Sequence, residues 1–307
     1  ISGKLTNMLG QIHDSDIKLL RIFQVIAECG GFSAAQAQLN VSQSAISTQM
    51  AQLEVRLGCR LCERGRGNFE LTEDGIAVLE ASEKLFAALE DFRNDVAEAR
   101  GRLTGELRLG LIDNTVTHED SRIRDAIAAF SEAAPDARIN IYVGGAVELE
   151  QQVLDGRLHI AVGLFHHQLE SIDYIPLFDE EHLLYCARKH PFFTRDDDAI
   201  TEEEFGKAGY VTWGYVEGLD GWEAPFSFNE VAASPYIEGV TYLILSGKYL
   251  GYLPTHYADL WQQRGELRAL LPTRLRRSFG FCLVKRKSGR LSNLSRLFLD
   301  KLGVNAE

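Results

Sequence analysis

The most constraining feature of the chain is a predicted helix over residues 42–57 that has two chemically different faces. Its apolar side chains recur at helical spacing along one face: Ile46, Met50, Leu53 and Leu57. Such a stripe predicts that this face packs against other helices. Ser42 stands where an N-cap is expected, and Gly58 stands where the helix ends. The segment is therefore predicted to be a short helix that packs on its neighbours along one side.

Two further helices are predicted before this one, and an extended hairpin after it. Apolar residues recur at three- and four-residue steps between Asp16 and Gly30, and a shorter helix is expected to begin with Ser33 as its cap. The stretch CRLCERGRGNFELTEDG then predicts two extended pieces around Arg64–Gly67. This order is that of a winged helix-turn-helix, in which the third helix enters the major groove of DNA.

The start of helix 42–57 carries small polar side chains on its other face. Glutamine can donate to and accept from an adenine edge, while serine and threonine bind phosphates or base edges. Arginines at the wing tip can reach the adjacent minor groove or backbone. A solvated surface helix is the alternative, but the caps, connector, wing and arginines in this order favour DNA. The predicted DNA-binding residues are Ser33, Ser42, Gln43, Ser44, Ser47, Thr48, Gln49, Arg64 and Arg66.

Charge is distributed unevenly along the chain. The 307 residues carry a net charge of −12, which by itself argues against a nucleic-acid partner. Residues 1–72 hold 7 Lys/Arg and 6 Asp/Glu, a net charge of +1, so the remaining residues hold −13. A near-neutral amino-terminal part joined to an acidic body indicates two separate tasks.

Composition excludes several classes of protein. No stretch approaches the ~20 apolar residues of a membrane span, and no secretory signal is recognised. The five cysteines are irregularly spaced and predict no disulfide framework, so we expect a reducing cytoplasm.

Cys59 and Cys62 form a C-x-x-C pair with no second pair at zinc spacing. Because a buried cysteine behaves as a small hydrophobic residue, we expect both to pack in the core, with a redox sensor as the alternative. No metal and no cofactor is predicted.

A long helix is predicted after the hairpin, over about 73–100, with Thr72 as its cap. Its apolar residues repeat every seven positions, at Val78, Leu85, Phe92 and Ala99. A heptad repeat of this kind indicates a helix that pairs with another helix.

Beyond residue 102, strand and helix patterns alternate. Strands are predicted at 105–112, 137–145, 158–165, 182–188, 209–213, 250–253 and 278–285, and helices at 118–133 and 146–156. The alternation predicts an α/β body with a mostly parallel sheet.

The segment FSAAQAQLNVSQSAISTQMAQLEVRLGCRLCERGRGNFELTEDG resembles the signature of the LysR-type transcriptional regulators. The resemblance continues in order through RLTGELRLGLI, LDGRLHIAVG, KHPF, SGKYLGYLP and LSRLFLDKL, and it covers residues 14–304. Two positions depart from the family pattern: Ser44 stands where many relatives have proline, and Thr48 where arginine is common.

The resemblance implies an α/β multidomain fold class in three parts. These are a winged helix-turn-helix at 13–72, a linker and dimerisation helix at 73–101, and a two-lobed effector-binding domain at 102–307 that is similar to periplasmic binding proteins. Lobe I would comprise 103–178 and 266–307, and lobe II 179–265. The resemblance also implies a homodimer through the linker helix, a homotetramer, a double-stranded DNA operator, a small-molecule effector that modulates operator binding, and contact with RNA polymerase if the protein is an activator.

The effector is expected between the lobes, at the carboxyl ends of the strands. Helix amino termini at such an edge suit an organic anion. Each candidate could instead serve the structure alone, as a helix cap, a core residue or an exposed loop residue. Thr241 is expected to stand at the beginning of a helix. The predicted effector-binding residues are Asp113, Asn114, Thr115, Gly144, Gly145, Ala146, Phe165, His166, Trp213, Val240 and Thr241.

Two other functions remain open at this point. A solute-binding protein of the same two-lobed fold would need export, and an enzyme would need a nucleophile–base pair or a metal site that the sequence does not assemble. The sequence therefore favours a DNA-binding regulator that is not an enzyme, with the redox-sensing regulator through Cys59 and Cys62 as a variant.

Overall fold

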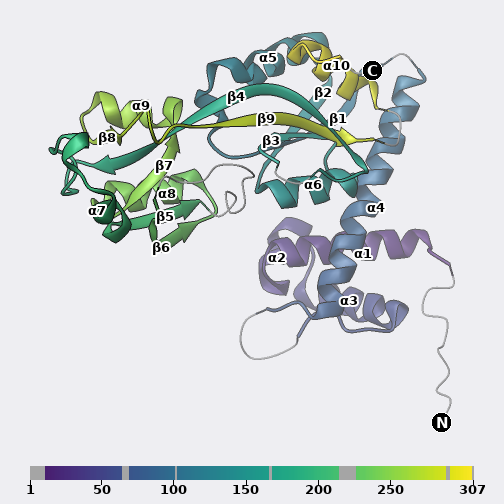
Figure 1. Ribbon diagram of the computed structural model, residues 1–307. Helices are drawn as coiled ribbons and strands as arrows, with labels where there is room; N and C mark the ends of the chain where they lie inside the picture. The colour runs from purple at the N-terminus through teal and green to yellow at the C-terminus, as the bar shows by residue number, and fades with distance from the viewer. Residues whose placement is uncertain are drawn as a thin grey trace. The chain divides into compact units, whose positions relative to one another are not determined.

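The computed structural model describes residues 11–63, 69–100, 102–165, 168–213, 226–287 and 291–305 (Figure 1). The chain divides into two compact units, with the boundary between Glu90 and Asp91.

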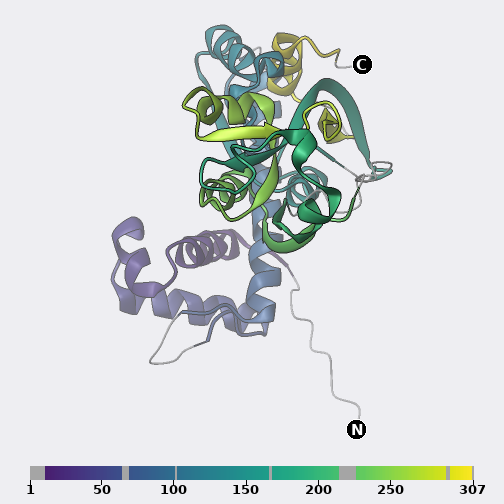
Figure 2. The same ribbon diagram turned by 60° about the vertical axis from the view of Figure 1, so that its left-hand side comes forward.

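The first unit is built on three short helices and the start of a long one. They are α1 (Asp14–Glu28), α2 (Phe32–Leu39), α3 (Gln43–Leu57) and α4 (Glu73–Glu98). The first three pack against one another around a shared core, and Figure 2 shows their purple to blue ribbons lying together. That core consists of Phe23, Ile26, Ala35, Ile46, Met50, Leu53 and Leu61. The apolar stripe predicted on the third helix is confirmed as its buried face.

Local capping follows the predictions at three positions and departs from them at one. Ser42 Oγ accepts from the backbone N–H of Ala45, Thr72 Oγ1 accepts from Gly75, and Gly58 ends α3 in the left-handed region. The prediction that Ser33 caps the second helix is wrong, because α2 begins at Phe32, two residues earlier than a cap at Ser33 requires. Gly31 takes the capping position with φ 149°, which a glycine adopts without strain.

The second unit contains one mixed sheet and its covering helices. Its strands are β1 (Gly105–Leu111), β2 (Ala137–Val143), β3 (Ile160–Gly163), β4 (Ile172–Ala187), β5 (Gly209–Trp213), β6 (Asn229–Ser234), β7 (Leu250–Pro254), β8 (Leu267–Leu270) and β9 (Arg277–Arg286). Its α-helices are α5 (Ile123–Ala133), α6 (Ala146–Leu154), α7 (Glu202–Lys207), α8 (Ile237–Leu245), α9 (Thr255–Gln263) and α10 (Asn293–Leu302). The strand order is β2-β1-β3-β9-β4-β7-β5-β6, and β8 pairs with β4.

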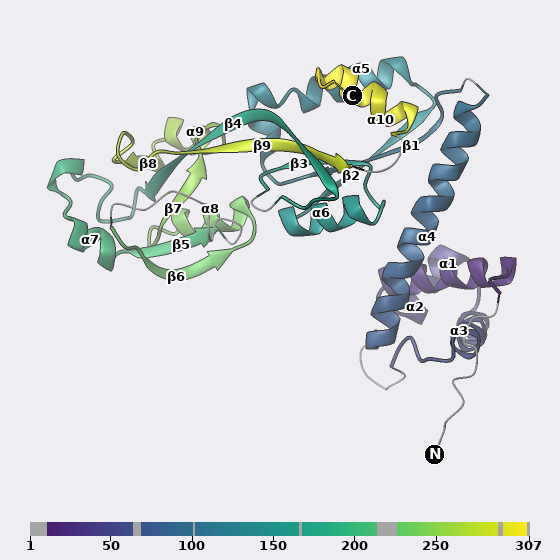
Figure 3. The same ribbon diagram turned by 45° about the vertical axis from the view of Figure 1, so that its right-hand side comes forward.

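The expectation of a mostly parallel sheet is wrong for the unit as a whole. β1 pairs in parallel with β2 and β3, and β5 does so with β6 and β7. The central strands β4 and β9 make antiparallel ladders, including a long one with each other. Figure 3 shows these two strands running side by side from one lobe into the other. The sheet is therefore two parallel halves joined by an antiparallel ribbon.

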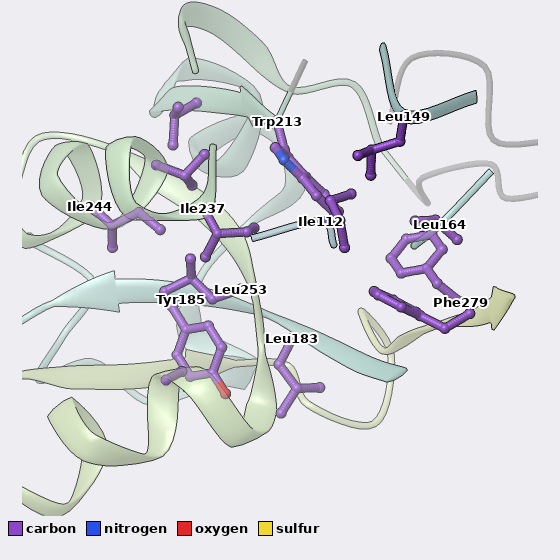
Figure 4. Close-up of a cluster of buried hydrophobic side chains, with 14 of the residues drawn as sticks. Ile112, Leu149, Leu164, Leu183, Tyr185, Trp213, Ile237, Ile244, Leu253 and Phe279 are labelled. Carbon is purple, nitrogen blue, oxygen red and sulfur yellow. The ribbon is translucent and has the colours of Figure 1, made fainter. Parts of the chain in front are cut away.

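Each half of the sheet carries its own helices. In lobe I, α5 and α10 pack with β1, β3 and β9 on one side, while Leu149 and Val153 of α6 pack on the other. In lobe II, α8 and α9 share one core with β4, β5 and β7, as the side chains around Ile237 and Leu253 show in Figure 4. A separate cluster around Phe205 and Leu250 covers the opposite face.

Two expected boundaries differ in the structure. The helix expected over 118–133 begins only at Ile123, after two short 3-10 turns and Arg122 in the left-handed region. Residues from 266 onward were expected in lobe I, yet β8 pairs with the lobe II end of β4, and Leu271 and Leu275 pack with Phe205 there. The chain thus returns to lobe I with β9, about ten residues later than expected.

Candidate nucleic-acid interface and ligand site

The amino-terminal end of α3 presents polar side chains to the outside. Gln43, Ser44 and Thr48 are exposed, as is Ser42, and Ser47 and Gln49 are half-buried. The Ser42 and Ser44 hydroxyls lie 3.1 Å apart, and Thr48 Oγ1 donates to the Ser44 carbonyl at 2.9 Å. Within the described part of the chain, the contacts of Ser42, Ser44 and Thr48 stay within the helix start, so their exposed side can meet a partner that offers donors and acceptors.

Three predicted DNA-binding residues lie elsewhere. Ser33 is exposed within the first turn of α2. Arg64 and Arg66 lie outside the described residues. The two ends of the hairpin are described, and they join through a bridge between Cys62 and Leu71.

An ion pair that sequence reasoning missed holds the far end of α3. Arg56 donates through Nε and Nη2 to the two oxygens of Asp16, at 2.9 and 2.6 Å. These hydrogen bonds hold the pKa of the nearly buried Asp16 below its usual value, and the backbone N–H of His13 adds to the effect. Because Asp16 stands in the first turn of α1, the pair fixes α3 against α1.

The C-x-x-C cysteines lie in the core of this unit. Cys62 is fully buried, and Cys59 is partly buried against the same cluster. Neither thiol forms a disulfide within the described residues. Burial raises the pKa of Cys59 and so lowers the fraction of reactive thiolate. This placement fits the packing role that we expected.

The loop after β1 reaches from lobe I to lobe II. Asp113 Oδ2 accepts from the backbone N–H of Ile237, the first residue of α8, at 2.7 Å. Asn114 lies in the left-handed region at φ 57°, and Thr115 is buried in the 3-10 turn that follows. Burial raises the pKa of Asp113 to about 6, and the charges of Glu180 and Glu238 act in the same direction.

The loop after β2 lies at the same edge of the sheet, because β1 and β2 are parallel neighbours. Gly144 donates to the Leu111 carbonyl at 3.1 Å, and a Cβ on it would lie 2.6 Å from the Tyr142 ring. Gly145 is the N-cap of α6, and Ala146 is its buried first residue. The structure therefore brings the predicted residues of the first two loops to one edge.

The remaining predicted effector residues are mostly buried. Phe165 packs on the Tyr174 ring, and His166 lies outside the described residues. Trp213 is 4% exposed and donates through Nε1 to the Pro235 carbonyl, and Val240 is fully buried. The expectation that Thr241 opens a helix is wrong, because α8 begins at Ile237 and Thr241 Oγ1 donates back to the Ile237 carbonyl.

A buried network between the lobes was missed by sequence reasoning. The two oxygens of Glu180 lie 2.6 Å from His182 Nε2 and 2.8 Å from His256 Nε2. His256 Nδ1 lies 2.7 Å from Thr117 Oγ1 of lobe I. Glu180 and His182 are two residues apart on β4, so their side chains lie on the same face of the strand. This spacing is the sequence signal that could have revealed the pair. Thr117 lies far away in the sequence, and only the fold brings it to this network.

Two findings bear on other classes of site. Within the described ranges, no helix combines the length and apolarity needed to cross a bilayer. Over the same ranges, no group of three or more His, Cys, Asp and Glu side chains has the arrangement of a metal site.

Comparison with known proteins gives matches along nearly the whole chain. The family model described as "Bacterial regulatory helix-turn-helix protein, lysR family" matches residues 17–76, and that described as "LysR substrate binding domain" matches residues 100–305. The HTH-type transcriptional activator BauR of Pseudomonas aeruginosa is 43% identical over 297 residues, which is 97% of each chain. The SDS degradation transcriptional activation protein of a Pseudomonas species is 30% identical over 190 residues, or 61% of each chain.

Solved structures show the same fold. CbnR, a LysR family transcriptional regulator, superimposes with a TM-score of 0.67 at 19% identity, covering 94% of this chain and 98% of its own. Full-length CbnR complexed with its target DNA gives a TM-score of 0.66 over the same shares. A helix-turn-helix followed by a two-lobed α/β body is thus shared along the chain. From these family matches and the close relative, we conclude that the chain belongs to the LysR family of transcriptional regulators.

Proposed function

We propose that the chain activates transcription by binding an operator through the start of α3 and by sensing a small molecule between its two lobes, without catalysis. One observation carries the DNA part of this proposal. Ile46, Met50 and Leu53 are buried on one face of α3, while polar side chains at its start are exposed on the other. The helix is thereby fixed to its own unit and keeps hydrogen-bonding groups available for a duplex.

Within this proposal, each predicted DNA-binding residue has a role. Gln43 and its exposed neighbours meet base edges and phosphates, and Arg64 and Arg66 meet the backbone or minor groove. Because Thr48 brings no charge where relatives often have arginine, affinity depends on several units binding together. The DNA-contacting set is Ser33, Ser42, Gln43, Ser44, Ser47, Thr48, Gln49, Arg64 and Arg66.

The small molecule is assigned to the region where the lobes meet. Asp113, Asn114 and Thr115 lie on one side with the Gly144–Ala146 turn, and Trp213 lies on the other together with α8. Phe165, His166, Val240 and Thr241 complete the proposed set. Binding here changes the arrangement of the lobes and thereby the operator affinity.

We assign α4 to dimer formation and place the protein in the cytoplasm, with its operator. Phe92 of the heptad pattern is 65% exposed, and Val96, one turn later, is 40% exposed. Exposed apolar side chains one turn apart on a long helix are suited to pairing with a second copy. Two such dimers would form a tetramer that spans a long operator and presents a surface to RNA polymerase. The division into 13–72, 73–101 and 102–307 belongs to this proposal.

A binding titration tests the division of labour at the DNA. Operator DNA is first selected by sequencing genomic fragments that the full-length protein retains. Gln43→Ala is expected to lower the preference for operator over scrambled DNA, whereas Arg64→Ala weakens binding to both alike. Gln52→Ala is the matched control, because Gln52 is exposed on the same helix but outside the proposed contact set. Failure to retain any specific fragment would refute the regulator function, and equal behaviour of the two variants would refute the assigned roles.

A further inference from the structure

Three side chains hold the end of α4 to lobe I. Asp91 Oδ1 lies 2.7 Å from Nη2 of Arg108 on β1 and 2.9 Å from Nε2 of His159, the residue that precedes β3. The side chains of Arg108 and His159 are each 9% exposed. Burial opposes ionisation of Asp91, but the hydrogen bond from His159 and the charge of Arg108 hold its pKa below the usual value, so the carboxylate is ionised. We call Asp91, Arg108 and His159 the α4 clamp.

The backbone of lobe I orients both donors of the α4 clamp. The backbone N–H of Arg108 donates to His159 Nδ1 at 3.0 Å, so Nδ1 is an unprotonated acceptor and the ring carries its proton on Nε2, toward Asp91. The guanidinium of Arg108 donates through Nε to the Arg157 carbonyl at 2.7 Å and through Nη2 to the Gly156 carbonyl at 3.0 Å. Each group that donates to Asp91 is therefore held in place by a further hydrogen bond.

A second contact lies almost one turn further along α4. Asn94 is 6% exposed, and its Nδ2 donates to the Glu106 carbonyl at 3.3 Å. Gly105 approaches this side chain so closely that a Cβ at Gly105 would clash with Asn94 Oδ1. Because Asp91 and Asn94 are three residues apart, they share one face of the helix. That face lies on the beginning of β1, so the last two turns of α4 form part of lobe I.

Two rigid elements connect the α4 clamp to the loops after β1 and β2, residues 113–115 and 144–146, which we call the ligand edge. β1 carries Arg108, and its end leads directly into loop 113–115. α6 begins at turn 144–146 and ends in the loop 155–159, which provides the remaining groups of the clamp. β1 is paired on both sides, and α6 packs in the core. Packed elements of this kind carry a displacement from one end to the other.

We propose that Asp91, Arg108 and His159 are positioning residues through which a change at the ligand edge reaches α4 and alters operator affinity. This inference rests on the sensing function proposed above. The connections through β1 and through α6 both end at these three side chains. α4 is one unbroken helix from Glu73 to Glu98, and the boundary between the two units falls within it. The turns that lobe I holds therefore belong to the same helix that begins in the first unit.

A double-mutant cycle on the operator affinity of the full-length protein tests the proposal. Asn114→Ala perturbs the ligand edge, because Asn114 has a φ of 57°, which alanine adopts only with strain. This substitution is expected to change operator Kd about fivefold or more in the parent and less than about twofold in an Asp91→Asn background. Asp95→Asn is the matched control background, because Asp95 is exposed one turn further along α4. The effect of Asn114→Ala should persist there.

A second edge variant and hydrogen exchange complete the test. Gly144→Ala repeats the cycle at the other loop, because a Cβ there would lie 2.6 Å from the Tyr142 ring. Peptides from residues 91–98 should exchange faster in Asp91→Asn than in the parent or in Asp95→Asn.

Three results overturn the proposal: equal effects of both edge substitutions in the parent and in Asp91→Asn, no effect of either on operator Kd in the parent, or unchanged exchange of the 91–98 peptides. Each leaves the DNA-binding function standing as long as the parent retains specific operator DNA. Loss of that retention by the parent itself would refute the DNA-binding function instead.

Discussion

The two-faced character of α3 leads to a quantitative prediction at Ile46. Its side chain is fully buried in the core of the first unit, whereas Val55 of the same helix is 82% exposed. Ile46→Ala removes three buried carbon atoms, at about 0.8 kcal/mol each, and leaves a cavity, so we expect a loss of about 3 kcal/mol. Val55→Ala should change stability by less than about 0.5 kcal/mol, because its side chain stays in solvent and alanine favours helix.

Amide hydrogen exchange measured on peptides from α1 and α3 gives the assay. The three tryptophans, at 213, 222 and 261, all lie in the second unit, so their fluorescence reports on that unit. Ile46→Ala should lower protection of α3 about a hundredfold, which corresponds to the expected free energy, and leave tryptophan fluorescence unchanged. Operator affinity should fall in parallel, since a loosened α3 no longer presents its polar start. Equal effects of the two substitutions would refute the assignment of buried and exposed faces.

Two further predictions concern backbone packing and charge. Gly75→Ala should destabilise the start of α4, because a Cβ there would lie 2.0 Å from the Leu61 carbonyl oxygen. Hydrogen exchange of peptides from α4 measures this loss of stability. Protection equal to that of the parent protein would contradict the close approach. In the folded parent protein the pKa of the Asp113 carboxyl is raised to about 6, so this group favours folding at low pH and costs stability as pH rises through that value. Asp113→Asn removes the titrating group. The variant should therefore be more stable than the parent in its second unit above pH 6, by at most about 3 kcal/mol. Denaturation followed by tryptophan fluorescence between pH 4 and 8 measures this, and a parent protein whose stability does not fall across that range would contradict the raised pKa.

Sequence patterns predicted those features that depend on nearby residues. Ser42, Thr72 and Gly58 were placed correctly, because a cap is set by backbone geometry within one turn. Three of the strands in the body, at 209–213, 250–254 and 277–286, lie within one residue of the prediction. The wrong prediction at Ser33 also concerns nearby residues. Gly31 is the N-cap of α2, whereas only serine was considered as the cap of this helix.

Features that join distant segments were not predicted. The antiparallel ladder of β4 and β9 pairs residues more than ninety positions apart, so neither strand's own pattern reveals it. The contacts of Asp113 with Ile237 and of Thr117 with His256 depend on how the lobes close. Thr241 follows Glu238, Gly239 and Val240, and only the packing of α8 shows that the helix begins before it, at Ile237.

The register shift in the β4–β9 ladder, between Pro176 and Phe178, has a mechanical consequence. A two-stranded ribbon resists stretching but twists readily, and a bulge is its most compliant point. We therefore predict that any movement of one lobe relative to the other is a rotation about this ribbon near Leu177, rather than a separation of two independent bodies. The protein needs no flexible hinge loop for such a motion, because the joint is made of hydrogen-bonded sheet.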